Sequence, residues 1–409
     1  MRIEAIAIGT ELLTSGRVDT NSVWIAQRLA SLGLAFQRKS AVGDEREDLR
    51  GLFREALGRS NLIICTGGLG PTFDDFTKEL WAEVLEAPLV EDLEIRQQIE
   101  TFFVNRGRPC PPSNFKQALI PIGAEALRNP LGSAPGIFWE NLQGFPETRI
   151  VLLPGVPREM KRMWEDHVEP RLRALAGAPI HTLRMLVGSV GESALDERMT
   201  PLRLKHRTLD WSILASLGTV ELVARSRYAA ALEEAQQDFE KELGLDRICT
   251  GTGTLESTVL DGLKQGGQTL AAAESMTGGR LAALLTGVPG SSEAFLGGAV
   301  VYSACAKTAL AGLTPAFIAA HGTVSEPVTA ALAEGIRARL KTDWAVAITG
   351  NAGPTEDPNG PAPAGTTFVA VAGPSGTQTM KSFFPAERAD VQARTTTLAL
   401  DFLRRCLLR

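Results

Sequence analysis

Short apolar, strand-like runs alternate with helix-length segments at the start of this chain. The strand-like runs cover residues 3–8, 34–42 and 62–65, and helix-like stretches at 21–32 and 47–57 separate them. Strands joined by helical segments of this length are typical of parallel βαβ units, whose sheets carry helices on both faces. The pattern therefore predicts a three-layer αβα domain at the N-terminus.

The last third of the chain repeats this alternation. Strand-like runs at 269–273, 299–303 and 344–349 are interleaved with helix-like segments at 278–285 and 327–340. The predicted fold class is therefore α/β, with two three-layer αβα domains of mostly parallel sheets joined by a small α/β linking domain.

Three domains follow from this pattern. A stretch at 170–179 holds Arg, Ala and Gly without core periodicity, which suits a domain boundary. The predicted boundaries are 1–170, 171–254 and 255–409.

The composition excludes several classes of protein. A net charge of −5 argues against a broad nucleic-acid face, because phosphate binding needs clustered Lys and Arg. The N-terminus lacks the pattern of a signal peptide, and no apolar run reaches the length that spans a membrane. Five scattered cysteines without a CxxC pair predict reduced thiols, and the four histidines are far apart. We expect a cytoplasmic protein that does not contact membranes or bind nucleic acid directly.

The segment AAAESMTGG places Ser275 between a strand and a helix that begins with glycine. Open α/β sheets bind ligands at the carboxyl ends of their strands, and a helix N-terminus offers N–H groups to an oxyanion or phosphate. A serine at such a junction also often serves as a helix N-cap, so this residue alone leaves both interpretations open.

The segment VVYSACAK carries Tyr302, one of two tyrosines in the chain, and Lys307 five residues later. A serine nucleophile needs a base. A lysine whose pKa is lowered by burial can act as one, and a tyrosine can relay or orient the proton. Taken singly, each residue could also have no catalytic role, Lys307 as a surface lysine and Tyr302 as a half-buried tyrosine. Taken together, Ser275, Tyr302 and Lys307 predict a hydrolase in the C-terminal third.

A third loop, ITGNAGPTEDPNG, contains glycines that allow the backbone to approach a ligand closely. In chain order, AESMTGG, YSxxxK, HGTVSEP and TGNAGP resemble the C-terminal domain of the CinA family over about residues 255–409. That domain is related to the nicotinamide-nucleotide amidohydrolases, which convert nicotinamide mononucleotide to nicotinic acid mononucleotide and ammonia.

The resemblance implies Ser275 as nucleophile, Lys307 as general base and Tyr302 as proton partner, with no cofactor. N–H groups at the helix start would hold the oxyanion. The nucleotide pocket would be lined by Thr277, Gly278, Gly279, Thr349, Gly350 and Ala352.

The chain departs from the family at three positions near this site. Met276, Ala304 and Gln392 stand where the family often has Cys, Asn and Arg. The last departure removes an expected positive contact to the substrate phosphate. Arg388 or Arg394 could supply it instead.

Near the N-terminus, TGGLGPTFDD joins a glycine-rich turn to two adjacent carboxylates, Asp74 and Asp75. The backbone of such a turn can cradle phosphate oxygens. Adjacent carboxylates beside it suit a divalent cation that bridges to a pyrophosphate, although they could equally cap the next helix.

With AIGTELLTSGRVDTNS, AVGDERE, NFKQA, NPLGSAPG and PGVPREM, this turn resembles the molybdopterin-binding-like domain at the front of CinA proteins, over about residues 1–170. The resemblance implies a metal-dependent ADP-ribose pyrophosphatase that yields AMP and ribose 5-phosphate, with Mg²⁺ or a similar divalent ion, and K⁺ as a further candidate. The implied phosphate-binding residues are Gly67, Gly68, Gly70, Pro71 and Thr72, completed by Asn114, Lys116 and Ser133. The implied metal-binding or water-activating residues are Asp44, Asp74 and Asp75.

One position weakens the metal site, because Thr10 stands where the broader domain family often has Asp. The leading hypothesis is a bifunctional hydrolase of pyridine-nucleotide salvage, acting on nicotinamide mononucleotide and ADP-ribose, and the family resemblance suggests a homodimer. Two alternatives remain: an adaptor protein of competence and DNA repair, and a molybdopterin-binding N-terminal domain.

Overall fold

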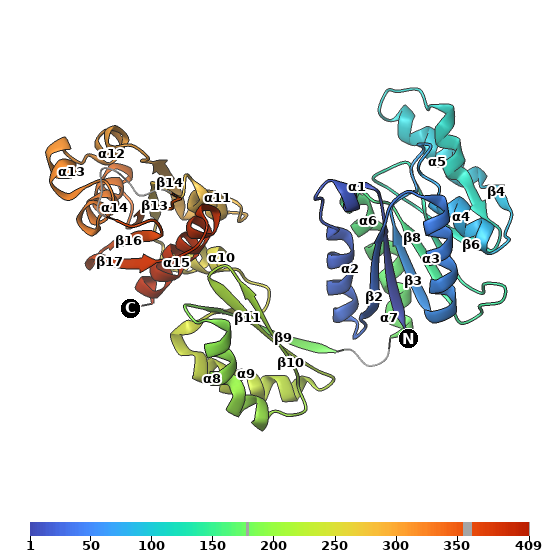
Figure 1. Cartoon of the computed structure of the whole chain (residues 1–409), viewed down its shortest axis with the longest axis horizontal. Helices are drawn as coiled ribbons and strands as arrows, with labels where there is room; N and C mark the ends of the chain where they lie inside the picture. The colour runs from blue at the N-terminus through green and yellow to red at the C-terminus, as the bar shows by residue number, and fades with distance from the viewer. Residues whose placement is uncertain (177–179, 355–361, 409) are drawn as a thin grey trace. The chain divides into compact units, whose positions relative to one another are not determined.

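The computed structural model describes residues 1–176, 180–354 and 362–408, and the chain forms two compact units, Met1–His181 and Thr182–Arg409 (Figure 1). The predicted boundary stretch lies partly outside the described residues, at 177–179. The predicted linking segment belongs to the second unit, where it forms a sheet of its own. The division into three domains stays a prediction.

The first unit is built on a six-stranded sheet with the order β2-β1-β3-β8-β7-β6. The first four strands in this order pair in parallel and the last two pair antiparallel. The strands are β1 (Ile3–Ile8), β2 (Phe36–Val42), β3 (Leu62–Thr66), β6 (Ala124–Leu127), β7 (Gly136–Trp139) and β8 (Arg149–Leu153).

Helices cover both faces of this sheet, which is why β1 and β3 are buried along their whole length. One core packs α3 (Arg46–Arg59) and α4 (Thr77–Val84) on the sheet, with Phe53 stacked on Trp81. The other packs α2 (Thr20–Ser31) and α6 (Pro157–Met163) on the opposite face. The predicted three-layer arrangement is confirmed.

The remaining elements of the first unit are short or lie outside these layers. Helix α5 (Leu93–Val104) packs against the 3₁₀ helix η1 (Pro112–Ala118). The others are α1 (Glu11–Thr14), β4 (Leu89–Glu91), β5 (Leu119–Pro121), the π-helical turn η2 (Trp164–Val168) and α7 (Glu169–Leu175).

The second unit contains two sheets. The smaller has the order β10-β11-β9-β12 and carries α8 and α9. Its elements are β9 (His181–Gly188), α8 (Glu192–Lys205), β10 (Asp210–Ser216), β11 (Thr219–Ser226), α9 (Ala229–Leu243), the 3₁₀ helix η3 (Gly244–Asp246) and β12 (Arg247–Thr250).

The larger sheet has the order β14-β13-β15-β16-β17, in which β14, β13 and β15 are parallel and the last two strands are antiparallel. Its strands are β13 (Leu270–Glu274), β14 (Phe295–Val300), β15 (Trp344–Gly350), β16 (Thr366–Gly373) and β17 (Gly376–Phe383). Helices α10 (Leu255–Gln265), α11 (Arg280–Thr286) and α15 (Arg388–Leu407) cover one face. Helices α12 (Ala304–Ala311), α13 (Pro315–His321) and α14 (Glu326–Leu340) cover the other, and η4 (Ser291–Glu293) is a short 3₁₀ turn.

Two element boundaries differ from those predicted. Helix α11 begins at Arg280 because Gly278 and Gly279 have φ angles of 62° and 97°, which a right-handed helix cannot contain. Strand β14 ends at Val300, and Ser303 already caps α12 by accepting a hydrogen bond from the N–H of Ala306. Tyr302 therefore lies in a loop, beyond the strand.

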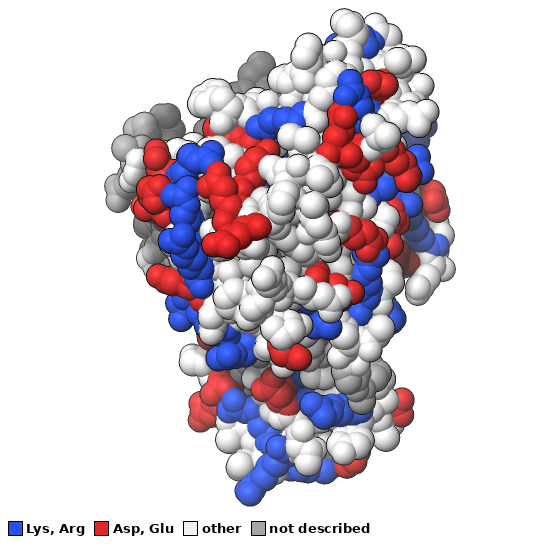
Figure 2. Space-filling view, turned by 90° about the vertical axis from the view of Figure 1, so that its right-hand side faces the viewer, with Lys and Arg blue, Asp and Glu red and all other residues white. Residues whose placement is uncertain are grey.

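The described residues contain no helix long and apolar enough to cross a membrane. On the face shown in Figure 2, basic and acidic side chains are interspersed.

Candidate active sites

The register of the larger sheet brings three loops together at the carboxyl ends of its parallel strands. Glu274 pairs with Val300 on one side and with Ile348 on the other, so Ser275, which follows it, begins a loop beside the ends of both neighbouring strands. The loops also touch, because a Cβ at Gly350 would lie only 3.0 Å from the sulfur of Met276.

Ser275 and Lys307 meet at this edge. The Nζ atom of Lys307 lies 3.1 Å from the Oγ atom of Ser275 and donates to the carbonyl oxygen of Val301 at 2.7 Å. Both side chains are buried, and burial lowers the pKa of Lys307 to about 8. A lysine that loses its proton this easily can accept the hydroxyl proton of a serine, which is the requirement for nucleophilic catalysis.

Tyr302 lies apart from this pair. Its side chain is 63% exposed, and its hydroxyl oxygen accepts a hydrogen bond from Arg388 at 3.2 Å. In the described residues its hydroxyl makes no hydrogen bond to Ser275 or Lys307. Its role as a proton partner stays a prediction.

The three departures from the family pattern have distinct surroundings. Gln392 donates to the carbonyl oxygen of Met276 at 2.6 Å, and Ala304 is the first residue of α12. Arg388 donates to the carbonyl oxygen of Gly353 at 2.8 Å and so lies at the third loop. Arg394 lines another cavity, next to the smaller sheet. Of the two arginines predicted to replace the missing cation, Arg388 lies near the predicted site.

The N–H groups at the start of α11 are already occupied, which corrects the expectation that they hold an oxyanion. The buried carboxylate of Glu274 accepts from the N–H groups of Gly279 at 3.1 Å, Leu281 at 3.0 Å and Ala282 at 2.8 Å. A carboxylate at a helix N-terminus is favourable because it meets unpaired donors.

Donors remain free one turn earlier in the chain. In the part of the chain that the structure describes, the N–H groups of Met276 and Thr277 make no hydrogen bond. The N–H of the residue that follows a serine nucleophile is a common oxyanion donor. These two groups are therefore the better candidates.

The predicted pocket residues lie around the same loops. The hydroxyl of Thr277 is buried and has no partner among the described residues. A buried polar group in this state fits an external ligand, because leaving it unpaired costs free energy. The hydroxyl of Thr349 pairs with that of Thr329 at 2.7 Å, and Ala352 is buried. Part of the third loop, 355–361, lies outside the described residues.

Most of the predicted residues of the N-terminal site line a cavity of about 580 Å³. Its lining includes Asp44, Gly67, Gly68, Gly70, Pro71, Thr72, Asp74, Asp75 and Ser133. The glycine turn lies tightly against its neighbours. A Cβ at Gly67 would meet the carbonyl oxygen of Ile8 at 2.2 Å, and one at Gly68 would meet the hydroxyl of Thr77 at 2.0 Å.

Two carboxylates converge on one hydroxyl in this cavity. The hydroxyl of Thr72 contacts both Asp74 and Asp75. The backbone N–H of Thr72 donates to the carboxylate of Asp75 at 3.0 Å. The hydrogen bond from Thr72 holds the pKa of Asp74 below its usual value. Two carboxylates that contact the same hydroxyl form a favourable site for a cation.

Asp44 belongs to a separate contact. Its carboxylate accepts from the N–H of Thr10 at 2.8 Å, and its own N–H donates to the hydroxyl of Thr10 at 3.1 Å. Across the described residues, no group of three or more His, Cys, Asp or Glu side chains is placed to hold a metal. The Asp74–Asp75 pair alone fits Mg²⁺, which commonly takes one or two carboxylates together with substrate phosphates.

Lys116 and Asn114 support the glycine turn from outside the cavity lining. Lys116 donates to the carbonyl oxygens of Thr72 at 2.6 Å and Asp75 at 2.5 Å. Asn114 donates to Gln117 at 3.4 Å, and Gln117 donates to the carbonyl oxygen of Leu69 at 3.3 Å.

Sequence reasoning missed several residues at this site. Buried Lys78 donates to the carbonyl oxygens of Lys116 at 2.8 Å and Gln117 at 3.4 Å, and burial lowers its pKa to about 8. Further residues line the cavity without having been predicted, including Glu11, Arg17 and Glu159. They lie in or beside the segments TELL and PREM, which carry no signal for a particular role.

These features define an α/β protein with a serine–lysine site at one sheet and a glycine–aspartate loop at another. Residues 252–407 match the family described as the CinA C-terminal domain, and residues 4–174 match the probable molybdopterin binding domain. The chain is 42% identical to a CinA-like protein of Parasynechococcus marenigrum (strain WH8102), over 99% of this chain and 98% of that one. It is 40% identical to a CinA-like protein of Koribacter versatilis (strain Ellin345), over the full length of both. The chain belongs to the CinA family.

Solved structures also match part of the chain. The protein CinA of unknown function from Thermoplasma acidophilum is 31% identical and covers 41% of this chain and 96% of its own, with a TM-score of 0.38. A competence-damaged protein (CinA) superfamily protein from Escherichia coli is 29% identical and covers 38% of this chain and 88% of its own, with a TM-score of 0.36.

Proposed function

We propose that the C-terminal domain is an amidohydrolase that converts nicotinamide mononucleotide to nicotinic acid mononucleotide and ammonia. The main support for this proposal is the 3.1 Å contact between Ser275 and buried Lys307, whose pKa is about 8. The choice of substrate rests on the family, whose related enzymes act on this nucleotide.

The reaction proceeds in two halves. Neutral Lys307 takes the proton of Ser275 as the Oγ atom attacks the carboxamide carbon, and the N–H groups of Met276 and Thr277 stabilise the oxyanion. Lys307 then gives its proton to the leaving nitrogen, the C–N bond breaks, and ammonia departs. In the second half, Lys307 takes a proton from water as the water oxygen attacks the acyl carbon. Lys307 then returns this proton to the Oγ atom of Ser275 as the acyl–oxygen bond breaks and the acid is released.

Ammonia release from nicotinamide mononucleotide tests this proposal. We expect turnover in the parent and a loss of at least about 10³-fold in Ser275→Ala and Lys307→Ala, because members of such a unit act together. Cys305→Ala is the matched control, since this exposed residue lies on the same helix as Lys307. A folded parent without turnover would refute the amidohydrolase and leave a nucleotide-binding or adaptor role.

A second activity, metal-dependent hydrolysis of ADP-ribose to AMP and ribose 5-phosphate, is proposed for the N-terminal domain. It is supported by the cavity in which the glycine turn meets the Asp74–Asp75 pair. These two carboxylates would hold Mg²⁺, which would neutralise phosphate charge, while backbone groups of Gly67–Thr72 would orient the diphosphate.

Calorimetry with ADP-ribose and Mg²⁺, beside a pterin ligand, separates this activity from molybdopterin binding. Heat with ADP-ribose, its loss in Asp74→Asn and the appearance of AMP would support the pyrophosphatase. Heat with the pterin alone would favour the molybdopterin alternative.

A gel-shift assay with DNA tests the adaptor alternative, which predicts binding that survives Ser275→Ala. The proposal also includes a homodimer in the cytoplasm, and light scattering at the monomer mass would contradict the dimer.

A further inference from the structure

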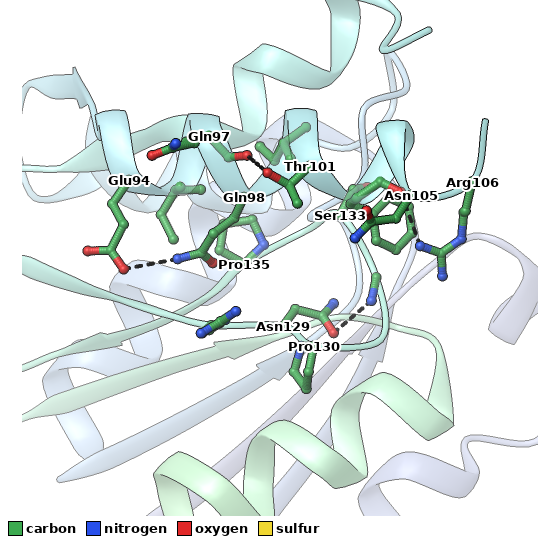
Figure 3. A pocket seen from close by; sticks show the side chains of 15 residues that line it. Glu94, Gln97, Gln98, Thr101, Asn105, Arg106, Asn129, Pro130, Ser133 and Pro135 are labelled. Carbon is green, nitrogen blue, oxygen red and sulfur yellow. Dashed lines mark hydrogen bonds between the residues drawn. The ribbon is translucent and has the colours of Figure 1, made fainter. Parts of the chain in front are cut away.

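Two side-chain amides hold backbone loops near the proposed sites. In the first unit, Asn129, which lines a cavity of about 390 Å³, donates to the carbonyl oxygen of Ala134 at 2.9 Å (Figure 3). In the second unit, Gln392 donates to the carbonyl oxygen of Met276 at 2.6 Å. Met276 directly follows Ser275, so the peptide group that Gln392 holds lies beside the proposed nucleophile.

The contact with Gln392 determines how one peptide group is oriented. The carbonyl that accepts from Gln392 and the N–H of Thr277 belong to the same peptide group, which joins Met276 to Thr277. This group is trans, because the one cis peptide bond of the described residues precedes Pro354. A trans peptide group is planar, and its carbonyl and N–H point in opposite directions. The hydrogen bond therefore turns the N–H of Thr277 away from the side chain of Gln392.

The N–H of Met276 is held in a different way. It belongs to the peptide group that begins with the carbonyl of Ser275, and this carbonyl accepts from the N–H of Gly278 at 3.2 Å. The N–H of Ser275 donates in turn to the carbonyl oxygen of Ile348 at 3.0 Å. Backbone contacts thus orient the N–H of Met276, whereas a side chain holds the peptide group that carries the N–H of Thr277.

Helix α15 gives the side chain of Gln392 a rigid support. Val391 and Thr395 are completely buried, and the hydroxyl of Thr395 donates to the carbonyl oxygen of Val391 at 2.6 Å. Val391 belongs to the same hydrophobic core as Met276. The helix and the loop are therefore packed together, and the amide keeps its place relative to the carbonyl that it holds.

We infer that Gln392 is a positioning residue that aims the N–H of Thr277 at the oxyanion. This inference rests on the proposed amidohydrolase, in which the N–H groups of Met276 and Thr277 stabilise that charge. A donor that is already oriented costs no reorganisation when the charge develops. A hydrogen bond to the carbonyl of a peptide group also polarises the group, which makes its N–H a stronger donor.

The test measures kcat and KM for ammonia release from nicotinamide mononucleotide. Gln392→Met keeps the length of the side chain and removes the donor. We expect kcat to fall about 10- to 100-fold while KM changes by less than about twofold, because an oxyanion contact acts in the transition state. Gln392→Asn keeps the amide on a shorter side chain and should lose kcat in the same way.

Two further variants separate the donor from the shape of the side chain. Gln392→Arg retains N–H donors, and arginine often occupies this position in the family, so kcat should stay within about threefold of the parent. The matched control is Arg394→Met, on an exposed residue of the same helix that lines a different cavity, and it should leave kcat unchanged. Circular dichroism checks that each variant is folded, and Gln392→Asn carries the test if Gln392→Met does not fold.

The outcomes separate the inference from the proposed function. A folded parent without turnover refutes the amidohydrolase, and the inference falls with it. In an active parent, an unchanged kcat in Gln392→Met and Gln392→Asn, or a rise in KM alone, overturns the positioning role and leaves the amidohydrolase intact. An equal loss of kcat in Gln392→Arg also overturns it, because the donor would then not be the property that matters.

Discussion

Lys307 Nζ lies 3.1 Å from Ser275 Oγ, and neither side chain has a carboxylate as a hydrogen-bonding partner in the described residues. A charged lysine in this position has little compensation for its lost hydration, and this is why burial lowers its pKa. The low pKa is thus a consequence of the same packing that places the amine on the serine.

The proposed amidohydrolase activity should depend on pH through Lys307. The lysine is a base only when neutral, so kcat/KM should rise about tenfold per pH unit below a pKa of about 8 and level off above it. A pH–rate profile of ammonia release between pH 6 and 9.5 measures this limb. A flat profile over that range would contradict Lys307 as the base.

Glu274 should be important for stability at the first loop. In Glu274→Gln one carboxylate oxygen becomes an NH₂ group that faces backbone donors, so N–H groups of α11 are left unpaired. We expect a loss of about 1–3 kcal/mol in the free energy of unfolding, measured by denaturant titration. Exposed Glu293→Gln is the control and should change stability by less than about 0.5 kcal/mol. Equal effects of the two substitutions would show that the buried carboxylate contributes nothing specific.

Lys78 should position the N-terminal site without touching substrate. Lys78→Met keeps the apolar stem and removes the hydrogen bonds to the carbonyl oxygens of Lys116 and Gln117, which adjoin the glycine turn. We expect ADP-ribose hydrolysis to fall by about tenfold, mainly in kcat, because the reacting groups lose alignment. Ammonia release from nicotinamide mononucleotide, in the other compact unit, should be unchanged and serves as the internal control. A parallel loss of both activities would indicate global unfolding instead of mispositioning.

The sequence was most informative where residue chemistry and strand order act together. The alternation of strands and helices predicted the two three-layer αβα arrangements. The strand-to-helix junctions predicted that Ser275 and Lys307 lie within reach of each other. Tyr302 was harder to place, because its position depends on where β14 ends, and Ser303 begins the next helix cap immediately after it.

Other features could not be read from local patterns. Glu274 is the last residue of the buried strand β13, and its sequence context does not indicate a separate role for its carboxylate. The turn at 275–279 brings the N–H groups of α11 onto this carboxylate. Lys78 is the second residue of α4, and the local sequence does not indicate that its side chain is buried. Its hydrogen bonds go to η1, nearly forty residues later in the chain. Asp44 is hydrogen-bonded to Thr10, which lies 34 residues earlier in the chain, and a local sequence pattern does not show such a contact.

Arg388 should provide the phosphate contact that Gln392 cannot. Its guanidinium reaches both the carbonyl oxygen of Gly353 and the hydroxyl of Tyr302, so it joins the second and third loops at the edge where Ser275 lies. A positive charge there favours a phosphorylated substrate, and Arg388→Gln should raise KM for nicotinamide mononucleotide about tenfold with a smaller change in kcat. The nucleoside without its phosphate should react equally well with the parent and this variant, since no charge is being recognised. Arg394→Gln is the matched control, because Arg394 lines a different cavity and should leave KM unaltered. If the two variants raise KM equally, or if Arg388→Gln impairs the nucleoside as strongly as the nucleotide, Arg388 supports the loops and does not bind phosphate.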